Sequence, residues 1–250
     1  MTDQFLFVVS PYLTAAASVP GCVVRYLLWS RRKAQAGSER AGDDGAGPIR
    51  AAWRWAIGLV AVGHLLAVAF PAVVLQWNQQ PMRLLVLEGA GLTTGIVALA
   101  SLIAMLVQCL RTADLDALCS PVDVVAWTLL VIELLSGLLV AVFYRWGSSW
   151  SAVTVTPYLR SLLRLDPDAA LVVRLPLPAR LHLFCAFALI AVVPFSRMAR
   201  VVIVPADRLA RWIAARAPSL ARPSWCALDD WSARMQPLRV RLTRDEEEEN

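Results

Sequence analysis

Five long blocks of apolar residues dominate this 250-residue chain and restrict it to one broad class of fold. The blocks are Phe5–Trp29, Ala51–Trp77, Leu84–Leu110, Val122–Trp146 and Leu181–Val204. Each exceeds the about 20 apolar residues that an α-helix needs to cross a bilayer, so some tilt is expected. Strands of a membrane barrel would instead alternate in polarity over about ten residues. The sequence therefore predicts an all-α membrane protein, a bundle of five transmembrane helices.

The charge distribution supports a membrane protein and argues against a nucleic-acid partner. Hydrophobic residues make up 58% of the chain and charged residues 17%, with a formal net charge of +5. The arginines flank the apolar blocks, where they anchor helix ends against anionic lipid headgroups. No basic patch interleaved with aromatic residues is found in a polar region, so the expected surroundings are lipid and no nucleic acid.

The basic residues also predict an orientation. The leader Met1–Gln4 has no basic residue, whereas Arg31, Arg32 and Lys33 follow the first block. Basic loops stay in the cytoplasm, so the N-terminus should lie outside and, after five spans, the C-terminus in the cytoplasm. The loop Gly147–Arg180 fits less well, because it carries several arginines on the predicted outer side.

Two regions are expected along the chain. Residues 1–205 form the five-span membrane domain, and residues 206–250 form a polar cytoplasmic tail that ends in the acidic run Glu246–Glu249. Within the outer loop, leucines at 159, 162, 163 and 165 recur near helical spacing, with Arg160 and Arg164 on the other side. This pattern predicts a short amphipathic helix on the membrane surface. It serves either as a lid over a binding pocket or as a plain connector.

The chain has two histidines, His64 and His182, and each lies inside an apolar block. Imidazole is a common ligand of haem iron, and two imidazoles are needed for a six-coordinate b haem. His64 follows Arg50 by 14 residues, which is about 21 Å along a helix and places it in the outer half of the bilayer. His182 lies close to the outer end of the fifth span. The pair is therefore predicted to hold one haem b, with two lone hydrogen-bonded core histidines as the alternative.

Other residues near the two histidines suggest supporting roles. Gly63 precedes His64, and a small residue there would let a flat macrocycle approach the helix. The glycines at 89, 91 and 137 either do the same or allow close helix packing. Glu88 and Glu133 are carboxylates inside spans, where an acidic residue is a functional candidate by default. Proton release is one use for them, and pairing with an arginine is the simpler one.

Three stretches of the chain are distinctive: GHLLAVAFP, RWGSSW followed by PYLRSLL, and RLHLFCAFALIAVVPFSRM. They resemble the membrane-anchoring cytochrome b (gamma) subunit of respiratory nitrate reductase. The resemblance runs from about Phe5 to Arg211. It implies a multi-pass protein of a bacterial or archaeal cytoplasmic membrane that oxidises quinol at the outer face. It also implies partners, an iron–sulfur subunit and a molybdenum catalytic subunit, so that no catalytic residue is expected in this chain.

The sequence departs from that family at one of two haem sites. Members normally carry four histidine ligands, and His64 and His182 match the pair that holds the outer haem. Arg54 and Arg200 stand at the other two positions. A guanidinium stays protonated and has no lone pair for iron. One haem is therefore expected, with Arg54 and Arg200 either anchoring helix ends or binding an anion such as a haem propionate, a lipid phosphate or a partner carboxylate.

The depth of residues near the outer helix ends suggests where quinol binds, and the loss of the inner haem leaves rival functions open. Arg83, Arg145, Ser148 and Ser149 near the outer helix ends are expected to orient the quinol oxygens. With one haem, the electron acceptor is either a closely approaching partner cluster, a periplasmic cytochrome c, or a different oxidoreductase. A membrane anchor or assembly subunit without redox turnover is the alternative function. A transporter or channel is a further one that no repeat or broken helix pair supports.

Overall fold

The computed structural model describes residues 4–35, 47–111 and 120–199, together with Asp207, Trp212 and Arg216. The chain divides into two units, Met1–Arg200 and Val201–Asn250. In the second unit, the Arg216 guanidinium lies 4.1 Å from the centroid of the Trp212 ring. The predicted boundary between residues 205 and 206 falls outside the described residues.

All regular structure in the described ranges is helical, as the sequence predicts. The elements are η1 (Phe5–Val9), α2 (Ser10–Gln35), α3 (Pro48–Ala69), α4 (Pro71–Trp77), α5 (Pro81–Arg111), α6 (Pro121–Phe143), α7 (Gly147–Val153), α8 (Val155–Leu163), α9 (Ala170–Val173), α10 (Leu177–Val192) and η3 (Val193–Phe195). Five segments are long and apolar enough to cross a membrane: Phe5–Ser30, Pro48–Ala69, Pro81–Arg111, Pro121–Phe143 and Leu177–Phe195. Their existence and order confirm the five predicted spans.

Prolines account for two differences between predicted and observed bounds. The second block breaks into α3 and α4, because Phe70 leaves helical geometry (φ −125°, ψ 56°) and Pro71 starts a new helix. Proline has no amide hydrogen to continue the helical bonds. The fifth helix begins at Leu177, directly after Pro176, and tightens into a 3-10 turn at Val193–Phe195 that includes Pro194. The remainder of the predicted fifth block, residues 200–204, lies outside the described residues.

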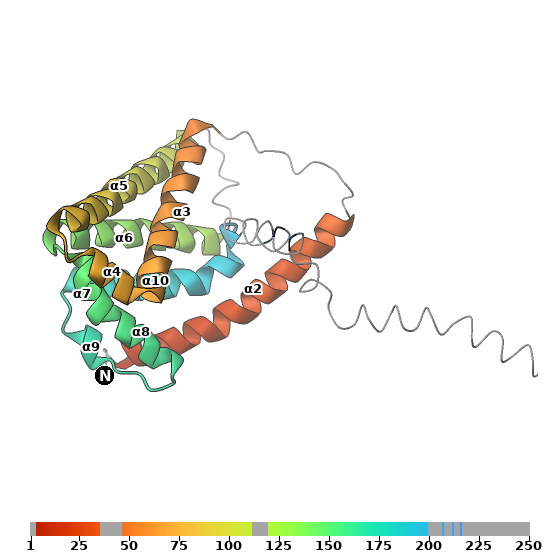
Figure 1. The fold of residues 1–250 in the computed structure, drawn as a ribbon. Helices are drawn as coiled ribbons and strands as arrows, with labels where there is room; N and C mark the ends of the chain where they lie inside the picture. The colour runs from red at the N-terminus through yellow and green to blue at the C-terminus, as the bar shows by residue number, and fades with distance from the viewer. Residues whose placement is uncertain are drawn as a thin grey trace, which may run out of the picture. The chain divides into compact units, whose positions relative to one another are not determined.

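The long helices form a row of neighbours that is not the order of the sequence. α3 packs against α5, α5 against α6, α6 against α10, and α10 against α2 (Figure 1). Large apolar side chains are exposed along these helices; Leu65 is 69% exposed and Phe143 is 71% exposed. In water such surfaces would be unfavourable, whereas in a bilayer they face lipid chains.

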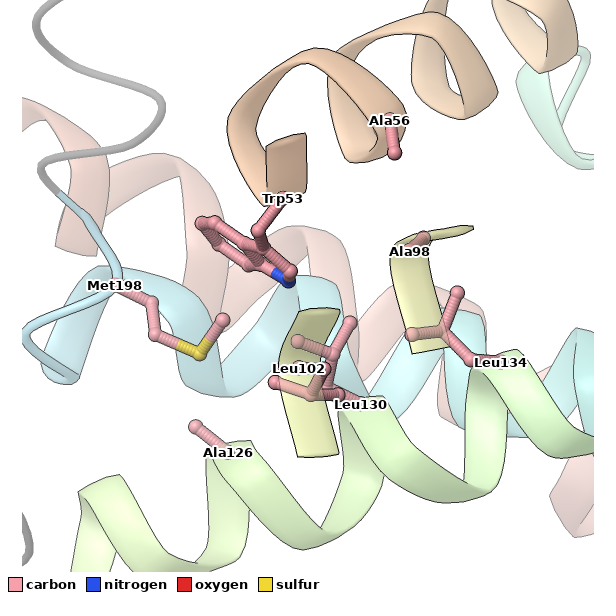
Figure 2. Close-up of a cluster of buried hydrophobic side chains, with 8 residues drawn as sticks. All are labelled: Trp53, Ala56, Ala98, Leu102, Ala126, Leu130, Leu134 and Met198. Carbon is pink, nitrogen blue, oxygen red and sulfur yellow. The ribbon is translucent and has the colours of Figure 1, made fainter. Parts of the chain in front are cut away.

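The two ends of this row differ, and we call them the tryptophan end and the histidine end. The tryptophan end comprises the start of α3, the end of α5, the start of α6 and the end of α10. The histidine end comprises the opposite ends of the same helices. A buried apolar cluster fills the tryptophan end: Trp53, Ala56, Ala98, Leu102, Ala126, Leu130, Leu134 and Met198. Figure 2 shows the Trp53 ring reaching from α3 toward Leu102 and Met198.

A second cluster joins the loop after α6 to the start of the chain. Phe7 packs with Tyr158, Leu162 and Val172. The Tyr158 hydroxyl donates a 2.8 Å hydrogen bond to the Phe7 carbonyl. Burial, followed by the charge of Tyr12, raises the pKa of Tyr158 above its ordinary value. The predicted amphipathic helix therefore exists as α8, and part of its apolar face packs against protein, while its position on a membrane surface remains a prediction.

Candidate haem site

The structure brings His64 of α3 and His182 of α10 together at the histidine end. The centroids of their rings are 6.0 Å apart, and the ring planes meet at 47°. The residues come from helices that are far apart in sequence and that are joined through α5 and α6. The fold thus places the chain's two imidazoles side by side.

The hydrogen bonds of the two rings define which nitrogen is available to a metal. Nδ1 of His64 lies 2.8 Å from the Val60 carbonyl oxygen, and Nδ1 of His182 lies 3.0 Å from the Glu133 carbonyl oxygen. A carbonyl oxygen only accepts, so each Nδ1 carries the hydrogen in the neutral ring. Each Nε2 then keeps its lone pair. This tautomer, fixed by a hydrogen bond from the other nitrogen, is typical of a metal-binding histidine.

The spacing of the rings also fits one shared iron. An imidazole nitrogen lies about 2 Å from a bound first-row metal, and the ring centroid lies about 1 Å further away. Two rings on opposite sides of one metal would therefore have centroids about 6 Å apart. The distance of 6.0 Å between His64 and His182 agrees with that arrangement. The residues present therefore fit a site that would hold one haem.

A short segment of α6 supports the His182 ring. The Glu133 carboxylate Oε1 lies 3.2 Å from Nδ1, and the Ser136 hydroxyl oxygen lies 3.4 Å from the same nitrogen. A Cβ atom added at Gly137 would lie 2.9 Å from Cε1 of the ring. A larger residue at position 137 would therefore force this imidazole to shift. The sequence identified Glu133 as a candidate, but its partner is His182 and not the arginine that seemed the simpler choice.

The surroundings of the other glycines are open. A Cβ atom added at Gly63 would have no neighbour within 4 Å among the described residues, and the same holds for Gly89 and Gly91. Close packing of neighbouring helices therefore does not explain these three glycines. His64 itself is exposed. The open face of α3 at Gly63 and His64 is compatible with the predicted approach of a flat macrocycle.

Of the two predicted arginine positions, only Arg54 lies within the described residues, and it is ten residues before His64 on α3. Arg54 is exposed on α3 at the tryptophan end, and Arg200 lies outside the described residues. The described charge pair at this end is a different one: Nε of Arg197 lies 3.5 Å from Oδ2 of Asp123. The Arg197 amide donates a 2.7 Å hydrogen bond to Oδ1 of Asp123. Sequence reasoning missed Asp123, although an acidic residue in the first turn after Ser120 and Pro121 is a signal for a helix start.

The predicted quinol residues separate into two groups. The hydroxyl oxygens of Ser148 and Ser149 both accept 2.9 Å hydrogen bonds from the side-chain nitrogen Nδ2 of Asn78. Ser148 also donates from its amide (2.9 Å) and from its hydroxyl (2.5 Å) to Oε1 of Glu88. We call Asn78, Glu88, Ser148 and Ser149 the serine network. Sequence reasoning missed Asn78, because an asparagine in a short polar loop has no distinctive pattern.

The two predicted quinol arginines lie beside this network without a described hydrogen bond to it. The guanidinium of Arg83 lies 5.1 Å from the Trp77 ring centroid, and Trp77 donates a 3.2 Å hydrogen bond to the Arg83 carbonyl. Arg145 is exposed, one residue before Trp146, whose φ of 67° forms the sharp turn into α7. The network and these arginines all lie at the histidine end.

Comparison with known proteins shows the family. A model of the nitrate reductase gamma subunit matches residues 3–217 of this chain. The chain belongs to that family. It is also 25% identical over 206 residues to the nitrate reductase gamma chain of Bacillus subtilis (strain 168), covering 79% of this chain and 90% of the relative. A gamma subunit implies other subunits of the same complex. Membership and the five apolar helices together indicate a multi-pass membrane protein.

Proposed function

We propose that this chain is a membrane cytochrome b subunit that passes electrons from quinol through one b haem to a nitrate reductase-like respiratory complex. The observation that supports the proposal most strongly is the pairing of His64 and His182, whose ring centroids are 6.0 Å apart and whose Nδ1 atoms both face carbonyl oxygens. These two residues would hold the haem through their imidazole nitrogens. When bound, the haem iron supplies one-electron redox chemistry between quinol and an acceptor.

The serine network supports a quinol site at the same end of the helices. Quinol oxidation releases two electrons and two protons, so its site needs groups that hydrogen-bond the ring oxygens and receive protons. Ser149 and Asn78 offer polar atoms to a quinol hydroxyl, and Glu88, already hydrogen-bonded to Ser148, offers a carboxylate that can hold a proton. Arg83 and Arg145 add positive charge near a developing quinol anion.

The charge pattern of the loops supports an orientation for this chemistry. With the N-terminus outside and the C-terminus in the cytoplasm, the histidine end faces the outside of a bacterial or archaeal cytoplasmic membrane. Protons from quinol would then leave on the outer side. An iron–sulfur subunit and a molybdenum catalytic subunit are the proposed partners on the cytoplasmic side, next to the tryptophan end.

The test is haem content in the full-length protein purified gently from membranes. A pyridine haemochrome assay and a reduced-minus-oxidised spectrum should give about one haem b per chain. The variants His64→Ala and His182→Ala should lose it, whereas Leu65→Ala, at an exposed neighbour of His64, should keep it. If the wild-type protein held no haem, the remaining function would be that of a membrane anchor. Two haems per chain would refute the expectation that Arg54 and Arg200 prevent binding of a second haem.

A second measurement tests the quinol step. A reduced quinol analogue should reduce the haem in wild-type membranes, and Ser149→Ala or Asn78→Ala should slow that reduction by about tenfold without lowering haem content. Dithionite, which needs no quinol site, should reduce the haem equally in all of these proteins. Unchanged quinol-dependent rates in both variants would remove the serine network from the proposal.

A further inference from the structure

The two histidines differ in the groups that contact Nδ1, and for His182 these groups belong to Glu133 on α6. His64 bonds through Nδ1 to Val60, a carbonyl of its own helix. His182 on α10 instead meets a separate helix, where Nδ1 lies within reach of both the backbone oxygen and the carboxylate of Glu133. The Glu133 side chain is 15% exposed, so its carboxylate acts with little screening by solvent.

We infer that Glu133 is a positioning residue for His182: its carboxylate fixes the imidazole with Nε2 facing His64 and makes it a stronger donor to iron. This inference rests on the proposed function, because it assigns a role toward the haem that His64 and His182 would hold. Two further contacts and one unpaired oxygen define the arrangement. Ser136 and Gly137 bound the same ring, and Oε2 of Glu133 is buried without a hydrogen-bond partner among the described residues.

The physical reason is the effect of a hydrogen-bonded carboxylate on an imidazole. An N–H that bonds to a carboxylate gives up more electron density to the ring than one that bonds to a carbonyl, which raises the basicity of the other nitrogen. A more basic ligand stabilises ferric over ferrous iron. The haem should therefore have a lower reduction potential with Glu133 than without it, and His64, whose Nδ1 faces a neutral carbonyl, provides no such bias.

The variant that tests this inference is Glu133→Gln. Glutamine keeps the length and an acceptor oxygen but removes the negative charge. We expect the haem to remain bound and the ratio of reduced to oxidised haem at a fixed solution potential to rise about tenfold, which is a shift of about 59 mV for a one-electron couple. Redox titration of the purified protein measures the shift, and the low-spin ferric EPR spectrum should change because the ligand field of His182 changes.

The matched control is Glu88→Gln, which makes the same charge change on α5 at a carboxylate bonded to Ser148 and not to a histidine. In titrations without quinol, Glu88→Gln should keep both the wild-type potential and the wild-type EPR spectrum. A Glu133→Gln protein with the potential and spectrum of wild type would overturn the inference. So would an equal shift in Glu88→Gln, because the effect would then come from general charge and not from positioning.

Two further outcomes keep this test separate from that of the proposed function. If wild-type protein holds no haem, the proposed function fails and not only the role of Glu133. If Glu133→Gln alone loses the haem, Glu133→Asp provides the answer, because it keeps the charge and withdraws the carboxylate from Nδ1. A haem-bound Asp variant with a shifted potential and EPR spectrum supports positioning, and one with wild-type values contradicts it.

Discussion

The same four helices make two ends of opposite chemistry. At the histidine end, polar groups from different helices meet: Glu133 contacts His182, and Glu88 contacts Ser148. At the tryptophan end, the space between the helices is filled by apolar side chains, with Trp53 4% exposed and Leu102 fully buried. Continuous apolar packing stabilises helix contacts in a membrane, whereas paired polar groups inside a bundle mark function.

The two ends differ in packing as well as in ligands. Arg54 stands where the family resemblance expects a histidine, and it is exposed rather than directed into the bundle. The neighbouring residue Trp53 is buried instead, and its ring lies 6.3 Å from that of Trp127 on α6. The tryptophan end therefore contains a closed apolar cluster beside the pair of Asp123 and Arg197, and the histidine end keeps the only described pair of imidazoles.

The largest expected effect comes from filling the space beside His182. In Gly137→Leu, the new side chain would occupy the position of the imidazole, since even a Cβ atom would lie 2.9 Å from Cε1. We expect haem content to fall from about one per chain to nearly zero, as measured by pyridine haemochrome on purified protein. The histidine end would then lose its function without any ligand being changed.

The control for this variant is at the other end. Gly58 lies on α3 near Trp53, and within the part of the chain that the structure describes, a Cβ atom there has no neighbour within 4 Å. Gly58→Leu should therefore keep full haem content. Normal haem in Gly137→Leu would show that the α6 surface does not hold His182 in the haem-bound protein.

The second prediction concerns stability at the tryptophan end. Leu102→Ala would leave a cavity in the cluster around Trp53, because Leu102 is fully buried and helix contacts there consist of close packing. We expect a loss of about 2 to 4 kcal/mol in the free energy of unfolding. Thermal unfolding in detergent, followed by circular dichroism, measures the change.

The same Leu102→Ala variant should leave the haem unchanged. The midpoint potential of the haem should be that of wild type, because Leu102 lies in the cluster of the other end. Leu110, 66% exposed near the end of α5, offers a matched leucine-to-alanine control with little expected loss. A large shift in haem potential in Leu102→Ala would show that the two ends are not independent.

Much of this arrangement follows from the sequence, because hydropathy and residue rarity are strong signals. Five long apolar blocks predict five helices, and two histidines in different blocks predict a pair. The break at Phe70 and Pro71 is harder to predict, because a proline alone does not indicate whether a helix bends or restarts. The contact of Glu133 with His182 depends on how α6 packs against α10, which no local pattern encodes.

The third prediction concerns the loop that packs at the start of α2. Tyr158→Phe removes the hydroxyl that donates to the Phe7 carbonyl at 2.8 Å, and leaves the ring packing intact. A buried neutral hydrogen bond contributes about 1 kcal/mol, so the free energy of unfolding should fall by that amount while haem content is unchanged. Tyr26→Phe, on the exposed part of α2, is the matched control.

The pH dependence of stability gives a second measure of the same contact. Burial raises the pKa of Tyr158, so its hydroxyl stays protonated when the protein is folded. The contribution of Tyr158 to the free energy of unfolding should therefore be constant through neutral pH. It should fall as the pH rises above the ordinary tyrosine pKa of about 10. Tyr158→Phe should show less of this alkaline loss. An alkaline profile identical to that of wild type would mean that the hydroxyl is not buried against Phe7.

The last prediction is that restoring ligands alone does not restore a second haem. In the double variant Arg54→His and Arg200→His, both missing imidazoles would be present in the sequence. The apolar cluster of Trp53, Leu102 and Met198 would still fill the tryptophan end, because none of its residues is changed. We expect the haem content to stay at about one per chain. Adding Trp53→Gly removes the largest side chain of the cluster, and only that triple variant should gain haem. If the double variant already held two haems, ligand identity alone would separate the two ends, and the difference in packing would be a consequence rather than a cause.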